Sequence, residues 1–259
     1  MNCNRGGWPS RFTLIVTGML LVLGSDWVHA KRLPSEQSGQ PRLEAFLPDG
    51  FQVDKVLRHD FANKGYRQYV VAISNHMNSE QPLMLLYLEH NGTWFVKDKA
   101  QIHPAASRDS ETMFDQPNYI DGLVLSKVGT QTLILFESVA SFGGSGANFF
   151  FDFYQIHNGR FALVKTFNHE RMEQTYFCIY NGAVYDAVFV NIKGKKVGKS
   201  FVHTCYLDVT KYTFDGVNFV ALGQERMREK QGNWTMADSY RFISVYKAVQ
   251  SGEIFAQPH

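Results

Sequence analysis

Asn-Gly and Asp-Gly dipeptides between aromatic-rich runs constrain the fold of this chain more than any other sequence feature. One unit recurs three times: a run rich in aromatic and β-branched residues, the dipeptide, and a second run that opens near an aromatic residue. It occurs at 85–96 (LLYLEHNGTWFV), 152–164 (DFYQIHNGRFALV) and 211–222 (KYTFDGVNFVAL). Asn, Asp and Gly tolerate the left-handed backbone of a two-residue type I′ turn. Each unit is therefore predicted to be a β-hairpin, and Asn181-Gly182 indicates a fourth.

Short β-branched and aromatic runs, separated by turn residues, continue from residue 51 to residue 221. This pattern is typical of antiparallel β proteins. Apolar residues at helical spacing from Phe242 to Val249 predict a C-terminal helix that stops at Gly252. The expected fold class is all-β, mainly antiparallel, either propeller-like or built of packed sheets, with this one helix. Strands are expected at 51–57, 69–74, 83–89, 119–126, 132–137, 148–156, 160–166, 175–180, 184–191, 200–208, 211–214 and 218–221.

The composition is that of a globular protein, with 44% hydrophobic and 14% aromatic residues among 259. This much apolar surface excludes disordered and collagen-like chains. The 26 basic and 24 acidic residues leave a net charge of only +2. Because proteins that coat nucleic acid need a strong basic excess, we expect no nucleic-acid partner.

The first thirty residues have the organisation of a secretory signal. Arg5 and Arg11 precede an apolar run at 12–23, and Val28-His29-Ala30 supplies small residues at the −3 and −1 positions. This order predicts cleavage after Ala30 and a periplasmic or secreted location. The run is short for a bilayer span, so no transmembrane segment is expected after cleavage. An uncleaved anchor or a buried helix is the alternative.

The remaining chain is expected to hold a flexible leader at 31–44 and one β-rich domain at 45–259. The leader is polar and contains two prolines, with no apolar periodicity. A proline- and charge-containing stretch at 103–118 interrupts the strand pattern. It is predicted to be a surface loop, with a domain boundary there as the weaker possibility.

Two cysteines, Cys178 and Cys205, remain after cleavage of the signal. In an oxidising compartment such a pair predicts a disulfide, worth roughly 3 kcal/mol in the loop-entropy description. Zinc binding with His203 is the alternative, but the chain has no CxxC and no second His at ligand spacing. We therefore expect no metal and no other cofactor.

Residues 47–73 (LPDGFQVDKVLRHDFANKGYRQYVVAI), together with the 85–96 hairpin, resemble a degenerate repeat of the FG-GAP or VCBS type. The resemblance extends more weakly to Val164. In that family a loop of the form DxNxDGxxD lies between strands, and the fold is a β-propeller. Asp60 and Gly65 match the loop, whereas Ala62, Lys64 and Gln68 stand where oxygen ligands belong. The resemblance thus implies a propeller-like fold, and Lys64 argues against bound calcium.

Gly143, Gly144, Ser145 and Gly146 nearly match the GxSxG nucleophile elbow. An elbow requires a helix after the serine. The run at 148–154 that follows is strand-like, so a hairpin loop is favoured over a hydrolase serine. Such a glycine-rich loop flanked by aromatic residues is a candidate contact surface.

Four lysines, Lys193, Lys195, Lys196 and Lys199, fall between two expected strands. The simplest interpretation is a solvated hairpin tip. The functional interpretation is electrostatic contact with an anionic envelope polymer or an acidic protein. Trp234, in a polar stretch, is a further candidate contact residue.

These features favour an exported, non-enzymatic binding or inhibitor protein that contacts another macromolecule of the cell envelope. The alternative is a cell-envelope hydrolase with dispersed catalytic residues, because a carboxylate pair is diagnostic only through its separation in space. A solute binder is a third possibility, and it would require a deep apolar pocket.

Secretion of the full chain is expected to yield a mature protein that begins at Lys31, because Ala30 fits the small −1 position. N-terminal sequencing of the exported product measures this directly. Ala30→Phe is expected to block cleavage at that bond. An exported product that keeps residues 1–30 would show the alternative, an uncleaved anchor.

Overall fold

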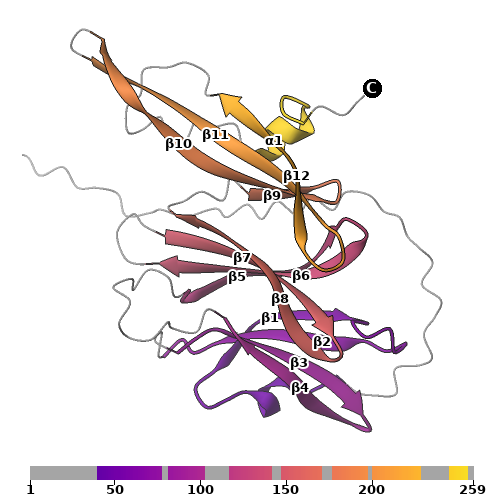
Figure 1. The fold of residues 1–259 in the computed structure, drawn as a ribbon. Coiled ribbons are helices and arrows are strands. Elements are labelled where there is room, and N and C mark those ends of the chain that lie inside the picture. The colour runs from indigo at the N-terminus through magenta and orange to yellow at the C-terminus, as the bar shows by residue number, and fades with distance from the viewer. Residues whose placement is uncertain are drawn as a thin grey trace, which may run out of the picture. The chain divides into compact units, whose positions relative to one another are not determined.

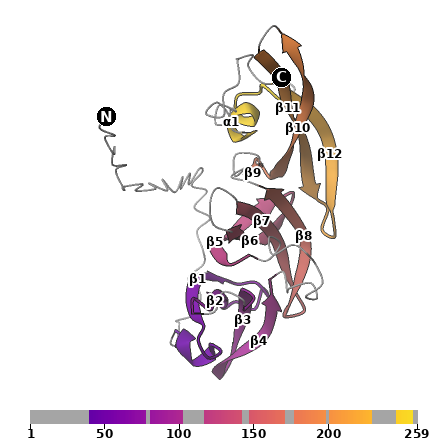
Figure 2. The same cartoon turned by 90° about the vertical axis from the view of Figure 1, so that its left-hand side faces the viewer.

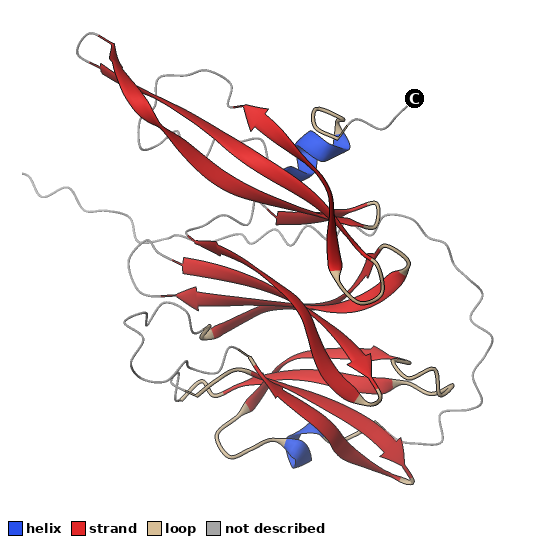
Figure 3. Ribbon diagram, viewed as in Figure 1, coloured by secondary structure: helices blue, strands red, loops and turns tan. Residues whose placement is uncertain are grey.

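The described chain forms three four-stranded antiparallel sheets, each built from four consecutive strands (Figures 1 and 3). The structure, a computed structural model, describes residues 40–77, 81–102, 117–141, 147–170, 177–197, 200–228 and 245–255. Within each sheet every strand pairs with its neighbour in the sequence. The expected class, all-β and mainly antiparallel with a C-terminal helix, is confirmed.

The elements are as follows. Sheet A contains β1 (Gln52–His59), β2 (Gln68–Ser74), β3 (Met84–Asn91) and β4 (Thr93–Gln101). Sheet B contains β5 (Tyr119–Val128), β6 (Gln131–Ser141), β7 (Ala147–His157) and β8 (Arg160–Glu170). Sheet C contains β9 (Phe177–Tyr180), β10 (Ala183–Val197), β11 (Ser200–Phe214) and β12 (Phe219–Arg228). A 3₁₀ turn, η1 (Leu43–Phe46), precedes sheet A, and helix α1 (Val245–Gln250) follows sheet C.

All four predicted hairpins are present, and two of them have the predicted turn. Asn158-Gly159, between β7 and β8, has φ of 52° and 74°. Asn181-Gly182, between β9 and β10, has φ of 47° and 71°. Two successive left-handed residues are what a type I′ turn requires, and these two turns are confirmed.

The other two hairpins turn differently from the prediction. At the β3–β4 turn only Gly92 is left-handed, with φ of 76°, and the residues on either side of it, Asn91 and Thr93, are already paired. At the β11–β12 turn, the Asp215 carboxylate accepts the backbone N–H groups of Val217 and Asn218 at 2.8 Å. The aspartate thereby closes a longer loop, in the way Asp side chains close turns elsewhere.

Several strands differ in extent from the expectation, with β6, β8, β10 and β12 all longer than predicted, and two further strands show the reason. β11 runs unbroken over Ser200–Phe214, where two separate strands were expected. β4 continues to Gln101, well past the short second arm of the predicted hairpin. In both cases cross-strand pairing carries the strand through polar residues that interrupt the apolar pattern.

Sheet B shares one apolar core with sheet A and another with sheet C (Figure 2). On the first face Phe136 packs with Tyr87 of sheet A, and both side chains are fully buried. On the second face Phe153 packs with Val184 of sheet C. Alternation of side chains along each strand of sheet B divides its apolar residues between these two cores.

The outer faces of sheets A and C are covered by short segments of the same chain. Leu43 and Phe46 of η1 join the core on the outer face of sheet A. Val245, Ala248 and Val249 of α1 join the core on the outer face of sheet C. Gly252, with φ of 73°, ends this helix, as predicted from its position after the apolar residues.

A contact between two turns links sheet B to sheet C. The N–H of Gly129, at the β5–β6 turn, donates to the carbonyl oxygen of Gly182, at the β9–β10 turn, over 2.7 Å. Gly129 has φ of 61°, and a Cβ there would lie 2.6 Å from the Phe214 carbonyl oxygen. Glycine is therefore required at this position both for its backbone conformation and for the close approach of β11.

Only part of the predicted domain organisation can be compared with the structure. Residues 37–259 form one compact unit. The expected signal at 1–30 and residues 31–39 of the expected leader lie outside the described residues. Near the end of that leader, Leu43 packs against sheet A. Residues 103–116 of the expected surface loop and weaker boundary also lie outside the described residues, and sheets A and B on either side of them share a core.

Among the described helices, neither has the length and apolar character that crossing a membrane would need.

Gly129→Ala is expected to lower the free energy of unfolding by about 2 kcal/mol or more, since it adds a left-handed penalty and a backbone clash. Gly92→Ala is the matched control, because Gly92 has φ of 76° and no atom within 4 Å of an added Cβ. Urea unfolding measures both. Equal losses for the two variants would show that the close approach of Gly129 to the Phe214 carbonyl oxygen adds nothing to the loss of stability.

Candidate functional site

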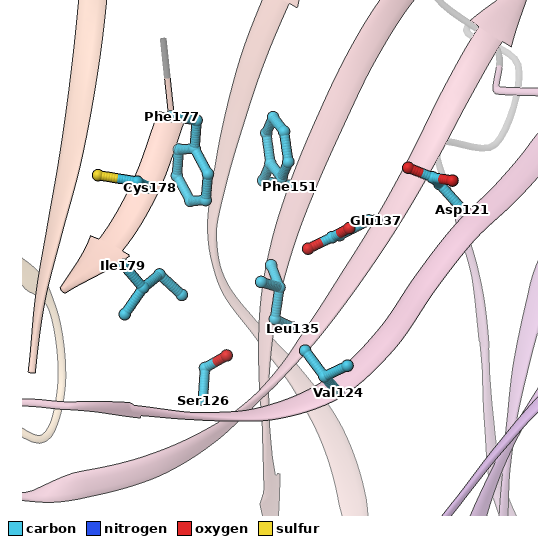
Figure 4. A pocket seen from close by; sticks show the side chains of 9 residues that line it. All are labelled: Asp121, Val124, Ser126, Leu135, Glu137, Phe151, Phe177, Cys178 and Ile179. Atoms are coloured by element: carbon cyan, nitrogen blue, oxygen red, sulfur yellow. The ribbon is translucent and has the colours of Figure 1, made fainter. Parts of the chain in front are cut away.

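A cavity of about 400 Å³ opens between sheets B and C (Figure 4). β5, β6 and β7 form one side of it, and β9 forms the other. Two carboxyl groups, a hydroxyl and two phenyl rings are among the side chains around it. The residues that line it are Asp121, Val124, Ser126, Leu135, Glu137, Phe151, Phe177, Cys178 and Ile179.

A β-bulge in β5 brings the two carboxyl groups to the same wall. The β5–β6 register shifts between Ile120 and Gly122, so Asp121 is the extra residue opposite Glu137. A bulge re-aims the side chain it carries. Gly122 leaves space beside it, because a Cβ there would lie 2.7 Å from Oε2 of Glu137 and would displace that carboxyl. The bulge and the glycine together make room for the Glu137 carboxyl next to Asp121.

Glu137 is a half-buried acid in this wall. No hydrogen bond or ion pair joins its carboxyl to any of the described residues. Burial raises the pKa of Glu137 to about 7, the nearby charge of Asp121 adds to the rise, and Lys55 opposes it. The group therefore changes charge close to neutral pH, as groups at functional sites often do.

The wall beside Glu137 is aromatic. Phe151 of β7 is the direct cross-strand partner of Glu137. Its ring is stacked on that of Phe177, with centroids 4.1 Å apart and planes 12° apart. In Figure 4 the Phe151 ring lies between Phe177 and the Glu137 carboxyl. The carboxyl group and the phenyl ring of its cross-strand partner are thus neighbours at the cavity.

A buried histidine–aspartate contact joins sheets B and C behind this aromatic wall. Nε2 of His169 lies 2.8 Å from Oδ1 of Asp186, without hydrogen-bond geometry. The rings of Phe151 and Phe177 both contact the His169 ring, with centroids 6.0 and 6.3 Å away. This contact places His169 of β8 in sheet B against Asp186 of β10 in sheet C.

The predicted Cys178–Cys205 disulfide is wrong for this structure. Cys178 is a free thiol, and burial raises its pKa to about 12. Cys178 pairs with Tyr185 of β10, whereas Cys205 pairs with Asn191, six positions further along that strand. That separation is roughly 20 Å, and a disulfide needs Cα atoms within about 7 Å. In Figure 4 the Cys178 sulfur points away from the two carboxyl groups.

The lysine cluster lies on a two-stranded extension of sheet C. β9 pairs with β10 only up to Asp186, and β12 pairs with β11 only from Tyr206. Residues 191–197 and 200–205 therefore pair only with each other among the described strands. We call residues 191–205 the basic arm. Lys193, Lys195 and Lys196 lie on its β10 strand, whereas the predicted Lys199 lies outside the described residues. The sequence of the arm contains no acidic residue.

The other predicted contact residues lie outside the described part of the chain. Gly143, Gly144, Ser145 and Gly146 are among them, as is Trp234. The strands on either side of the glycine loop, β6 and β7, are antiparallel neighbours, and Ser141 pairs with Ala147. These paired strands confirm the expected hairpin connection. A nucleophile elbow requires a helix after the serine, and the chain continues there as strand β7.

The loop that resembles an FG-GAP repeat is closed by its own hydrogen bonds. The Asp60 carboxylate accepts the backbone N–H groups of Lys64 and Gly65 at 2.9 and 2.8 Å. Lys64 Nζ lies 2.8 Å from the buried Glu89 carboxylate, which also accepts from the Tyr87 hydroxyl. Burial by itself raises the pKa of Glu89, but these two hydrogen bonds outweigh burial and lower it. Lys64 is thus a structural residue of sheet A.

Sequence reasoning missed Asp121, Glu137 and the His169–Asp186 contact. Asp121 and Glu137 are sixteen positions apart, and no motif joins them. Gly122 followed by an apolar run was the only available signal, because a glycine inside a strand pattern indicates a bulge. Within the described ranges, no group of three or more His, Cys, Asp or Glu residues is arranged to hold a metal ion.

Comparison with known proteins gives no relative: no family model matches this chain, and no curated protein matches it significantly.

Glu137→Gln is expected to stabilise the protein at pH 8 by roughly 1–3 kcal/mol and to change its stability little at pH 4.5. The folded-state pKa of about 7 exceeds the ordinary value of 4.5. Wild-type stability is therefore complete below pH 4.5 and falls as the pH rises toward 7, a loss that glutamine avoids. Urea unfolding at the two pH values measures the difference. The exposed Glu44→Gln is the control, and a pH-independent effect of Glu137→Gln would contradict the prediction.

Proposed function

We propose that this protein is exported and binds an acidic partner protein of the cell envelope through the basic arm. The observation that carries the proposal is the projection of the arm beyond the neighbouring strands of sheet C. A role in binding or inhibition, without catalysis, accounts for this element. The export signal predicted at 1–30 supports the envelope location.

The charge of the arm favours an anionic partner. Four lysines and no acid within fifteen residues give the arm a charge of +4, in a chain whose total is +2. The remainder of the chain is therefore slightly acidic, and the positive charge is concentrated in one element. Such local concentration steers an oppositely charged partner and raises its association rate.

The backbone of the arm favours a polypeptide over a polysaccharide or a polyphosphate. A two-stranded ribbon presents N–H and C=O groups along its edges, and β10 and β11 have no further partner there among the described strands. An extended peptide can add to such an edge through main-chain hydrogen bonds. The lysines then select an acidic segment.

A cell-envelope hydrolase is the second candidate, and the acid pair Asp121 and Glu137 is the observation in its favour. One acid with a raised pKa beside a second acid is the arrangement used in glycoside hydrolysis. We rank it second for a geometric reason. Asp121 lies in the bulge next to the Gly122–Glu137 pair, so the two acids share one wall, whereas glycosidase carboxylates flank the bond that is cleaved.

The double variant Lys195→Gln/Lys196→Gln is expected to weaken binding of poly-L-glutamate about tenfold at low salt, because it removes half of the charge of the arm. Biolayer interferometry over a range of salt concentrations measures the effect. Lys99→Gln/Lys127→Gln is the matched control, since it removes the same charge from exposed positions on sheets A and B. Equal losses for the two double variants would refute the role of the arm.

Polyphosphate is the second probe in the same experiment. We expect it to bind less tightly than poly-L-glutamate at equal charge, since it cannot add to a strand edge. Tighter binding of polyphosphate would assign the arm to an anionic polymer instead of a protein.

A further inference from the structure

We infer that the cavity between sheets B and C binds a small primary amine in its ammonium form. The inference concerns a different part of the molecule from the basic arm and does not rest on the function proposed above. Its recognition groups are the carboxyls of Asp121 and Glu137 and the ring of Phe151.

The first step of the argument is the position of the two carboxyl groups. Because Asp121 occupies the bulge opposite Glu137, both carboxyls are directed to one wall. They are close enough for the charge of Asp121 to oppose ionisation of Glu137. An acid whose ionisation is opposed by a neighbouring negative charge is stabilised in its charged form when a cation binds beside it. An ammonium group meets this need and can donate up to three hydrogen bonds.

The second step is the aromatic wall. Phe151 is stacked on Phe177 on one side, and its cross-strand partner is Glu137. The face of a phenyl ring carries partial negative charge and attracts a cation, most strongly where water is excluded. Leu135 and Ile179 supply apolar surface for the carbon chain of such a ligand. The hydroxyl of Ser126 offers one more acceptor at the rim (Figure 4).

The third step is the destabilising effect of Glu137 on the folded state. A half-buried acid without a partner among the described residues destabilises the folded state at neutral pH. Leucines at positions 133 and 135 occupy the same face of β6, so an apolar residue would fit the pattern of this strand. Groups that weaken the fold in this way are concentrated at functional sites.

The size of the cavity restricts the ligand to a small molecule. A volume of about 400 Å³ is at the lower end of the range for small-molecule sites. It accommodates a short alkylamine or an amino sugar and is too small for a folded partner. Neutral ligands of the same size carry no positive charge that could pair with the two carboxyl groups.

Binding is expected to depend on pH with a definite sign. The charged and titratable groups that face Glu137 are Asp121 from β5 and Lys55 from β1, and the Cys178 thiol of β9 lines the same cavity. The pKa of Glu137 is about 7, so its charged fraction rises about tenfold between pH 6 and pH 8. The affinity for an ammonium ion is therefore expected to rise about tenfold over that interval.

The test is a titration of the full chain with n-butylammonium, followed by calorimetry and by NMR of ¹³C-labelled carboxyl groups. Saturable binding with a shift of the Glu137 carboxyl signal, tighter at pH 8 than at pH 6, is expected. n-Butanol, which has the same length and no charge, is expected not to bind. Equal binding of n-butanol, or a pH-independent affinity, would overturn the proposal.

Two variants test the contributions of the Glu137 carboxyl and the Phe151 ring separately. Glu137→Gln keeps the shape of the cavity and is expected to weaken binding at least tenfold at pH 8, while the variant itself stays folded. Phe151→Leu keeps both carboxyls and is expected to weaken binding severalfold through loss of the ring. Glu44→Gln is the charge-matched control and is expected to bind as the wild type does.

A simple glycoside is the last ligand tested in this experiment. Binding or hydrolysis of a methyl glycoside, together with no response to n-butylammonium, would reassign the cavity to the hydrolase function. Loss of amine binding in Glu137→Gln with an intact urea unfolding transition would support the amine site. The basic arm is unaffected by either result, so the two proposals fail separately.

Discussion

Burial of sheet B on both faces is the constraint on which the rest of the molecule depends. Its strands alternate between two cores, so that Phe136 lies in one and Phe153 in the other, both fully buried. Antiparallel sheets commonly leave one face in water. Here sheet B needs a neighbouring sheet on each side, and each of those sheets needs a cover of its own, which η1 and α1 provide.

The cavity lies at the position on β6 beyond which the face of sheet B toward sheet C is no longer fully buried. Along the face of β6 toward sheet C, Leu133 and Leu135 are buried, and Glu137 takes the next position of the same face. The bulge at Asp121 disturbs the pairing at that level. A site thus arises at the end of a packed face through one change of residue type and one extra residue. The His169–Asp186 contact marks the same transition from apolar to polar packing.

Local features of this fold could be predicted from the sequence, and features that depend on register could not. The Asn158-Gly159 and Asn181-Gly182 turns follow from two neighbouring residues, and they were predicted correctly. The Asp215 loop depends on a side-chain hydrogen bond, which the dipeptide alone does not reveal. The disulfide was predicted wrongly because compartment and cysteine count say nothing about the strand positions of Cys178 and Cys205. Likewise the acid pair could not be predicted, because it depends on which residue of β5 lies opposite Glu137. The resemblance to FG-GAP repeats stays a prediction.

The meander order of each sheet has a consequence for how the chain reaches its folded state. Every strand pairs with a strand that is adjacent in sequence, so hydrogen bonding within each sheet closes only short loops. Folding of such topologies is limited by few long-range encounters. A chain that emerges from its N-terminus can complete the strand pairs of sheet A while later residues are still absent. The inner face of sheet A, with Val70 and Tyr87, is then available for sheet B to cover, and the second face of sheet B is available to sheet C. The order of layers would thereby become an order in time.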